Sequence, residues 1–197
     1  MYPVRIDGNG LCVREFTDSD VDALLAIYGD PAVTRYMSFD PRTRDQVAAT
    51  IAMAIRTATI EPRVEYSLAV AIPDTTEMIG FGRLAVDSGH PAQRSAQIGF
   101  ALRADQWGRG YGAETVRLLH RLGFAELGMH RIWGARSPDN TVSDQLMNKL
   151  GMIEEGRIRG HVCVRGAWRD SIVHSILEDE WTPRPSTDTV SQNPATT

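Results

Sequence analysis

Three glycines at alternate positions, Gly108, Gly110 and Gly112, lie in the segment DQWGRGYGAE that spans residues 105–114. Glycines spaced in this way let the backbone approach a phosphate closely, because no side chain stands in the way. Where such a segment opens a helix, the unpaired main-chain N–H groups of the first turn carry partial positive charge and bind a diphosphate. Arg109 adds a cation between two of the glycines. The segment therefore predicts a pyrophosphate-binding loop.

Two other interpretations of the glycines stay open. One is a plain glycine-rich turn between a strand and a helix. The other is a dinucleotide-binding fingerprint, because Gly108, Gly110 and Ala113 satisfy G-x-G-x-x-A. That fingerprint follows its strand directly and opens its fold, whereas here Arg103–Trp107 intervene and half of the chain comes first, so the context disfavours it. A Walker-type nucleotide loop is excluded, because no Gly-Lys-Ser/Thr sequence occurs.

A second set of polar side chains falls on one face of a helix predicted over Asp139–Leu150. Asn140, Ser143 and Met147 stand at positions i, i+3 and i+7, which share a helix face. Short polar residues at the start of a helix are also typical caps, so Asn140 and Ser143 have a structural interpretation beside the functional one. The predicted buried face of this helix consists of Val142, Leu146 and Leu150.

The composition limits the partners that these residues serve. The chain has 197 residues, a formal net charge of -4 and a pI of about 5.7, and this balance favours neither a nucleic-acid nor an anionic-membrane partner. No signal peptide is expected, and the weakly polar run Val47–Ile60 is too short to span a bilayer. We therefore expect a cytoplasmic protein with no membrane partner. Cys12 and Cys163 lack metal-ligand spacing, and no metal is expected.

Periodicity and turn signals predict the elements that must position both sets of residues. The predicted helix that follows the glycines buries Leu118, Leu119, Leu122 and Ala125. In chain order the predicted elements are strand Leu11–Arg14, helices Val21–Tyr28 and Thr43–Thr57, strands Tyr66–Ile72, Met78–Val86 and Ser95–Leu102, helix Gly110–Leu127, strand His130–Ala135, helix Asp139–Leu150, and strands Ile153–Val162 and Trp168–Leu177.

This order predicts one α/β domain over residues 1–181, with a mixed, mostly antiparallel sheet and flanking helices. The three consecutive strands with short turns imply an antiparallel meander, and the glycine segment lies where the antiparallel part meets the parallel part. From Thr182 to Thr197 the chain is rich in Thr, Ser and Pro with almost no apolar residues, so a disordered tail is expected there.

Several short motifs follow one another along residues 11–181: DPAVTRY at 30–36, QIGFAL at 97–102, WGRGYGAE at 107–114, NTVS at 140–143, KLGM at 149–152, GAWRD at 166–170 and Glu180-Trp181. In this order and spacing the chain resembles the GNAT superfamily of acetyl-CoA-dependent N-acetyltransferases. The closer resemblance is to the branch that contains the ribosomal-protein alanine acetyltransferases. The predicted order of helices and strands agrees with that fold.

The resemblance implies that the loop Trp107–Gly112 holds the pyrophosphate of CoA and that the backbone of Phe100–Leu102 pairs with the pantetheine arm. A main-chain amide of that strand is implied to polarise the thioester carbonyl. Asn140 is implied to contact the arm and Ser143 to lie near the sulfur, which makes these two the catalytic candidates. The implied cofactor-binding residues are Phe100, Ala101, Leu102, Trp107, Gly108, Arg109, Gly110, Tyr111, Gly112, Asn140 and Ser143.

Two positions depart from the pattern of the family. Met147 stands where many members carry Tyr, and Gln97 stands where many carry Glu, so neither residue can donate or accept the proton in the usual way. Ser143 is then the nearest candidate acid, directly or through water. His161 is a candidate base, and attack by an already neutral amine, with water removing the proton, is the alternative.

The resemblance implies transfer of acetyl to a primary amine, a protein N-terminus or a small molecule, by direct attack in a ternary complex. We expect the acceptor to contact Tyr36 with its loop and the hairpin Gly156–Trp168, and we expect Tyr66 to pack in the core. A catalytically weak acyl-CoA-binding regulatory domain is the alternative function, and a homodimer stays open. The hairpin carries four arginines: Arg157, Arg159, Arg165 and Arg169. They are consistent with binding of an anionic acceptor and equally with an exposed surface that water solvates.

Overall fold

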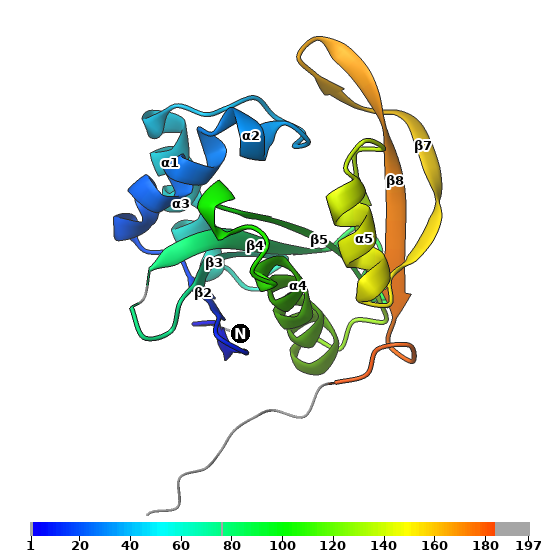
Figure 1. Ribbon diagram of the computed structural model, residues 1–197. Coiled ribbons are helices and arrows are strands. Elements are labelled where there is room, and N and C mark those ends of the chain that lie inside the picture. The colour runs from blue at the N-terminus through cyan, green and yellow to red at the C-terminus, as the bar shows by residue number, and fades with distance from the viewer. Residues whose placement is uncertain (1, 76, 184–197) are drawn as a thin grey trace, which may run out of the picture.

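The computed structural model describes residues 2–75 and 77–183, and within them eight strands form one sheet in the order β1-β2-β3-β4-β5-β6-β8-β7 (Figure 1). Neighbouring strands are antiparallel except β5 and β6, which pair in parallel. The mixed, mostly antiparallel sheet is therefore confirmed. The strands are β1 (Arg5–Asp7), β2 (Cys12–Glu15), β3 (Glu65–Ala71), β4 (Met78–Val86), β5 (Ser95–Leu102), β6 (Arg131–Arg136), β7 (Ile153–Val164) and β8 (Ala167–Leu177).

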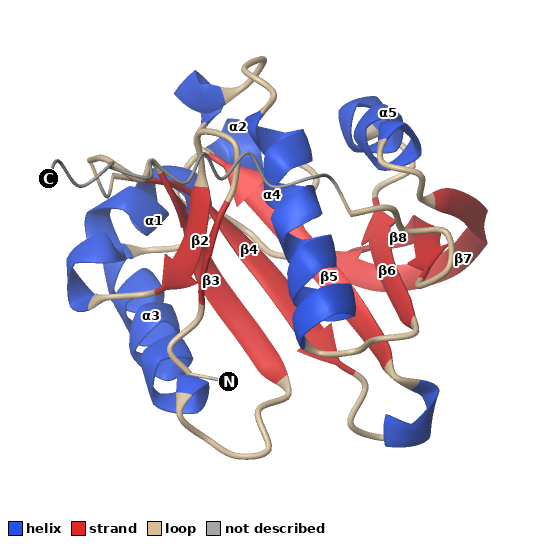
Figure 2. Cartoon of the chain, turned by 90° about the horizontal axis from the view of Figure 1, so that it is seen from below, coloured by secondary structure: helices blue, strands red, loops and turns tan. Residues whose placement is uncertain are grey.

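Helices cover both faces of this sheet (Figures 1 and 2). On one face α1 and α3 bury an apolar cluster with Phe81 of β4, and on the other face α4 buries a larger cluster with Leu84 of the same strand. Side chains of a strand point alternately to the two faces, so the central strands are apolar on both sides. The helices are α1 (Val21–Tyr28), α2 (Pro31–Thr34), α3 (Arg44–Ala58), α4 (Tyr111–Arg121) and α5 (Thr141–Lys149).

Side-chain hydrogen bonds hold the segment before α1 and cap the start of α3. Before α1, the Asp20 carboxylate accepts from the main-chain N–H of Thr17 at 2.8 Å and from both terminal nitrogens of Arg14, each at 2.8 Å. At α3, Gln46 Oε1 accepts from the N–H of Thr43 at 2.9 Å while the Thr43 hydroxyl accepts from the N–H of Gln46 at 3.4 Å. This reciprocal capping box satisfies N–H groups that the helix itself leaves unpaired.

The helix predicted over residues 110–127 consists of α4 followed by a π-helical turn, Leu122–Glu126. In that turn the N–H of Leu127 donates to the carbonyl of Leu122 at 3.0 Å, so the chain gains one residue per turn. Phe124 is consequently buried, whereas Ala125 is exposed. The prediction that Ala125 lies on the buried face was wrong for this reason.

One short strand and one short α-helix were not predicted. Strand β1 has three residues, too few for a periodic signal, and it extends the sheet beyond β2. Helix α2 has four residues in a segment expected to be a loop. Its first residues are nevertheless typical of a helix start. Asp30 caps the helix by accepting from the N–H of Ala32 at 2.8 Å, and Pro31 occupies the first helical position.

The β7–β8 hairpin is longer than predicted and extends past the end of β6, whose pairing with β8 is confined to residues 172–177 (Figure 1). Its tip is a two-residue turn with positive φ at Arg165 (53°) and Gly166 (73°), which matches the twist of the strands. Residues 159–161 of β7 bulge opposite Asp170, which accepts from the N–H of Gly160 at 2.7 Å. Hydrogen bonds between β7 and β8 thus stabilise the part of the hairpin that projects beyond β6.

No helix in residues 2–75 and 77–183 has the length and apolarity needed to cross a membrane. The predicted disordered tail, Thr182–Thr197, lies outside the described residues from position 184 onward.

His120 on α4 gives the fold a predicted acid sensitivity. Its side chain is 2% exposed, and burial, with a smaller effect of the nearby Arg117 guanidinium, lowers its pKa to about 4. In the unfolded chain its pKa is about 6.5. Below that pH the unfolded chain binds a proton that the folded chain resists, so the free energy of unfolding is expected to fall by on the order of 2 to 3 kcal/mol between pH 6.5 and 4.5.

Urea unfolding at pH 7 and pH 4.5 measures this loss of stability. His120→Leu should show a smaller loss than the wild type, whereas His161→Gln, which replaces an exposed histidine, should lose as much as the wild type. An equal loss in wild type and His120→Leu would contradict the assignment.

Candidate active site

The parallel strands β5 and β6 part in the middle of the sheet. They pair at Ser95–Arg131, Ala96–Ile132 and Gln97–Trp133, and beyond these residues β5 continues to Leu102 and β6 to Arg136 without pairing to each other. On its other side β5 stays paired with β4 as far as Leu102. The β6-facing edge of residues 98–102 therefore has no strand partner among the described residues, and an extended ligand can pair with it as an additional strand.

The glycine loop lies at the end of that edge and opens α4. Gly108 and Gly110 have φ of 77° and 83°, and a Cβ added to either would meet no atom within 4 Å. Within residues 2–75 and 77–183, no acceptor binds the main-chain N–H groups of residues 108–112. The two glycines are thus required by backbone conformation, and they leave a row of exposed donors at a helix N-terminus, as the sequence predicts.

Gly112 lies in a tight helix contact. A Cβ at this position would lie 3.0 Å from Cδ1 of Leu146, so a larger residue in the first turn of α4 would push against that side chain of α5. The alternation of glycines therefore combines two physical demands: left-handed backbone at Gly108 and Gly110, and close helix packing at Gly112.

Trp107 fixes the loop to the end of β5. Its indole N–H donates to the carbonyl of Leu102 at 3.0 Å, while the side chain remains 50% exposed. Arg109 is exposed, and Tyr111 packs against the larger core beneath α4. Of the predicted pantetheine-binding residues, Phe100 is half-buried, whereas Ala101 and Leu102 are buried. The loop is therefore held to the protein through Trp107 and Tyr111, and its outer side is exposed.

Asn140 and Ser143 meet at the start of α5. Asn140 Oδ1 accepts from the N–H of Ser143 at 3.1 Å, so the capping interpretation applies to that oxygen. In the described part of the chain no partner binds the Asn140 amide nitrogen or the half-buried Ser143 hydroxyl. Both groups remain available for a ligand.

The buried face of α5 differs from the prediction. Val142, expected in the core, is 73% exposed, while Met147, expected beside Asn140 and Ser143, is 5% exposed. The Met147 Cε lies 3.2 Å from where a Cβ on Gly134 of β6 would stand, so the flexible thioether fills the space that this glycine leaves. Leu146 and Leu150 are partly buried against the same core, in line with the prediction.

The remaining candidates for proton transfer and acceptor contact differ in their burial. Gln97 is half-buried on β5, opposite Ala85 and Trp133 on the two neighbouring strands. His161 is exposed in the bulge of β7. Tyr66 is 3% exposed, with the Arg63 guanidinium 4.3 Å from its ring centroid, which confirms its place in the core.

The two segments predicted to contact the acceptor touch each other. Arg165 at the hairpin tip forms an ion pair with Asp40 at 3.0 Å and donates to the carbonyl of Thr34 at 3.4 Å. Arg169 on β8 donates to the carbonyl of Met37 at 3.3 Å. The hairpin and the loop 34–40 therefore contact each other.

A cluster of possible metal ligands lies at the base of α5. Ligand atoms of Asp144, Glu154 and His174 lie within 4.8 Å of one another. The Arg136 guanidinium already binds all three: its Nε donates to His174 Nε2 at 3.1 Å, and its Nη2 donates to Asp144 at 2.7 Å and to Glu154 at 3.2 Å. Burial, followed by the charge of Arg136, lowers the pKa of His174. The arrangement is an ion-pair network that fastens α5 to the sheet.

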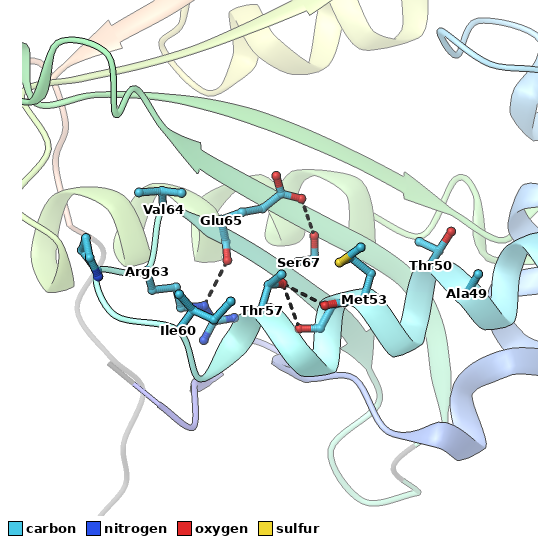
Figure 3. A pocket seen from close by; sticks show the side chains of 11 residues that line it. Ala49, Thr50, Met53, Thr57, Ile60, Arg63, Val64, Glu65 and Ser67 are labelled. Atoms are coloured by element: carbon cyan, nitrogen blue, oxygen red, sulfur yellow. Dashed lines mark hydrogen bonds between the residues drawn. The ribbon is translucent and has the colours of Figure 1, made fainter.

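A separate hollow of about 580 Å³ lies between α3 and β3 (Figure 3). Met53, Ile60 and Val64 line it with partly exposed apolar side chains, and Glu65 and Ser67 form its polar side. None of the residues predicted to bind CoA or to take part in catalysis lines this hollow. The candidate active site is therefore at the parting strands and the glycine loop.

Comparison with known proteins identifies the family to which this arrangement belongs. Residues 10–153 match the acetyltransferase (GNAT) domain family. The chain belongs to the GNAT acetyltransferases. This GNAT chain is 30% identical to the N-acetyltransferase p20 of Bacillus licheniformis over 174 residues, which cover 87% of this chain and 94% of p20. It is 27% identical to the [ribosomal protein uS5]-alanine N-acetyltransferase of Escherichia coli over 114 residues, which cover 56% and 57% of the two chains.

Solved structures confirm the GNAT fold. A putative acetyltransferase from T. thermophilus superposes with a TM-score of 0.76 at 26% identity, covering 92% of this chain and 93% of its own. Mycobacterium smegmatis RimJ in complex with CoA-disulfide superposes with a TM-score of 0.74 at 20% identity, covering 86% and 83%. The predicted fold, the family and the acyltransferase class are thus confirmed.

Proposed function

We propose that this GNAT acetyltransferase moves acetyl from acetyl-CoA to a primary amine by direct attack in a ternary complex. One observation carries the proposal: the unpaired edge of β5 is followed, after residues 103–107, by the row of N–H groups that opens α4, and no described residue binds these groups. The first feature suits an extended amide-containing arm, and the second suits a diphosphate. CoA has both parts in one molecule, in the same order.

The binding roles follow from this match. The N–H groups of residues 108–112 hold the pyrophosphate, and exposed Arg109 adds positive charge beside it. The main chain of Phe100–Leu102 pairs with the pantetheine arm, and an N–H of β5 stabilises the negative charge that develops on the thioester oxygen. The Asn140 amide nitrogen and the Ser143 hydroxyl, neither bound by a described residue, face the arm and the sulfur from the start of α5.

Proton transfer in this chain does not use the residues that many relatives use. Gln97 cannot act as a base, and Met147 is buried beside Gly134. We therefore propose that the amine attacks in its neutral form, that water removes its proton, and that Ser143 donates a proton to the departing sulfur, directly or through water. The C–N bond forms first and gives a tetrahedral intermediate, the C–S bond breaks as that intermediate collapses, and no acyl-enzyme is involved.

The acceptor is proposed as a protein N-terminus or a small-molecule amine. The name of the Escherichia coli relative supports the first, since that protein acts on the alanine of a ribosomal protein. A cytoplasmic location, a homodimer and the absence of a nucleic-acid partner stay predictions.

A thiol-release assay with acetyl-CoA and a panel of peptides and small amines tests this function. Release of free CoA that depends on an added amine, with the acetylated amine detected by mass spectrometry, is the expected result. Tight CoA binding without turnover on any amine would contradict it and would favour a regulatory acyl-CoA-binding domain.

A further inference from the structure

Arg169 has a charge that the rest of the described chain does not balance. Its only hydrogen bond within residues 2–75 and 77–183 is the 3.3 Å contact to the Met37 carbonyl, and its Nε is buried without a partner. No carboxylate in these residues forms an ion pair with it. Burial, then the charge of nearby Arg165, lowers its pKa, so the surroundings work against its positive charge.

The other arginines of the hairpin are either paired with a carboxylate or exposed. Arg157 pairs with Asp170 at 2.6 Å, and Arg165 pairs with Asp40 at 3.0 Å. Arg159 has no such partner among the described residues either, but it is exposed and water solvates it. A guanidinium that is half-buried and unpaired bears a desolvation penalty, and proteins recover that penalty when an anion binds. Arg169 therefore differs from the other three arginines of the hairpin, because it is half-buried and no described carboxylate balances its charge.

The unpaired guanidinium of Arg169 lies at the proposed acceptor site. Arg169 is on β8 and contacts the loop 34–40 through Met37. The Asp139 carboxylate, one residue before Asn140, is near enough to act on its pKa without pairing to it. The guanidinium thus lies where the hairpin meets the loop 34–40, near Asp139, which directly precedes Asn140 at the start of α5.

We propose that Arg169 selects the acceptor by binding its carboxylate, so that the preferred substrates are amines that carry a nearby carboxylate group. The inference rests on the proposed function, because it concerns the acceptor of the same reaction. A guanidinium offers two parallel N–H groups to a carboxylate, which gives orientation as well as affinity. Bound in this way, the carboxylate holds the amine at a fixed distance from the acetyl group. Polycationic amines are disfavoured, because the unpaired charge of Arg169 repels them.

The test uses pairs of acceptors that differ only in one carboxylate. Peptides beginning Ala-Asp are compared with the same peptides beginning Ala-Asn, and free alanine is compared with alaninamide, so that a side-chain and a free α-carboxylate are measured separately. In the wild type we expect kcat/KM to be about tenfold higher for the carboxylate-bearing member of at least one pair. Arg169→Gln should reduce that ratio to near one, and Arg169→Lys should keep part of it.

Arg121→Gln provides the matched control, because it removes the same charge from an exposed position at the end of α4, outside the segments that are expected to bind the acceptor or CoA. It should retain the preference, and thermal unfolding should show that both variants are folded. Equal kcat/KM for both members of both pairs, or a preference that survives Arg169→Gln or is lost equally in Arg121→Gln, would overturn the inference while the acetyltransferase function stands.

If no amine is acetylated, the proposed function fails, and calorimetric binding of the same acceptors to the protein–CoA complex decides the inference alone. Tighter binding of the carboxylate-bearing member in the wild type, and not in Arg169→Gln, supports it. Equal binding of both members overturns it.

Discussion

Gly110→Val is expected to raise the Kd for CoA at least about tenfold, a loss of about 1.4 kcal/mol or more of binding free energy. A side chain at this position would project into the open space above the N–H row, where a Cβ meets no protein atom within 4 Å. It would also force a β-branched residue into φ of 83°, which disturbs the donors that follow. Calorimetric titration with CoA measures the effect.

Gly128→Val is the matched control for this prediction. Gly128 also has positive φ, 64°, and open space around its Cβ, but it lies in the turn before β6, away from the loop. Both variants should lose stability by about 1–2 kcal/mol through backbone strain. Only Gly110→Val should lose CoA affinity. Equal CoA affinity in the two variants would mean that the glycine loop does not hold the pyrophosphate.

Ser143→Ala is expected to lower kcat on the order of 100-fold and to change CoA affinity little, because a proton donor acts in the transition state rather than in the ground state. The hydroxyl is half-buried at the first turn of α5, and no described residue binds it. The cap of the helix should survive, since Asn140 binds the main-chain N–H of residue 143 and not its side chain.

Thr141→Ala separates a role of this hydroxyl from a general effect on α5. Thr141 is exposed in the same first turn, and its replacement also removes a hydroxyl. Steady-state kinetics with saturating acetyl-CoA should show near-normal kcat for Thr141→Ala and the large loss for Ser143→Ala. A kcat for Ser143→Ala within about threefold of the wild type would leave protonation of the sulfur to water alone.

The network around Arg136 explains how the fold supports these positions. Its guanidinium joins Asp144 on α5 to Glu154 on β7 and His174 on β8. The Arg136 and His174 side chains are 9% and 0% exposed, whereas those of Asp144 and Glu154 are 31% and 50% exposed, so solvent screens the two carboxylates in part. The network ties α5 to the sheet at Asp144, in the helix turn that follows Asn140 and Ser143.

The sequence by itself determined the elements and the loop that carries the glycines. The strands of the meander are separated by short turns, and the caps of α3 are residues three positions apart, so each signal is local and visible in the chain. The same holds for Gly108 and Gly110, whose backbone conformation follows from the turn that they form. The predicted order of the main strands and helices followed from these local patterns, and the family followed from the resemblance carried by the short motifs along residues 11–181.

Only the tertiary structure decided which side chains face the site. On α5, Met147 is buried and Val142 is exposed. Gly134, which is on β6, leaves room for the thioether of Met147. The hairpin meets the loop 34–40 through Arg165 and Asp40, which are 125 residues apart in the chain. The charge of Arg169 becomes informative only when its buried, unpaired position is known. Contacts between distant segments have no periodic or local signature, so they were outside the reach of sequence patterns.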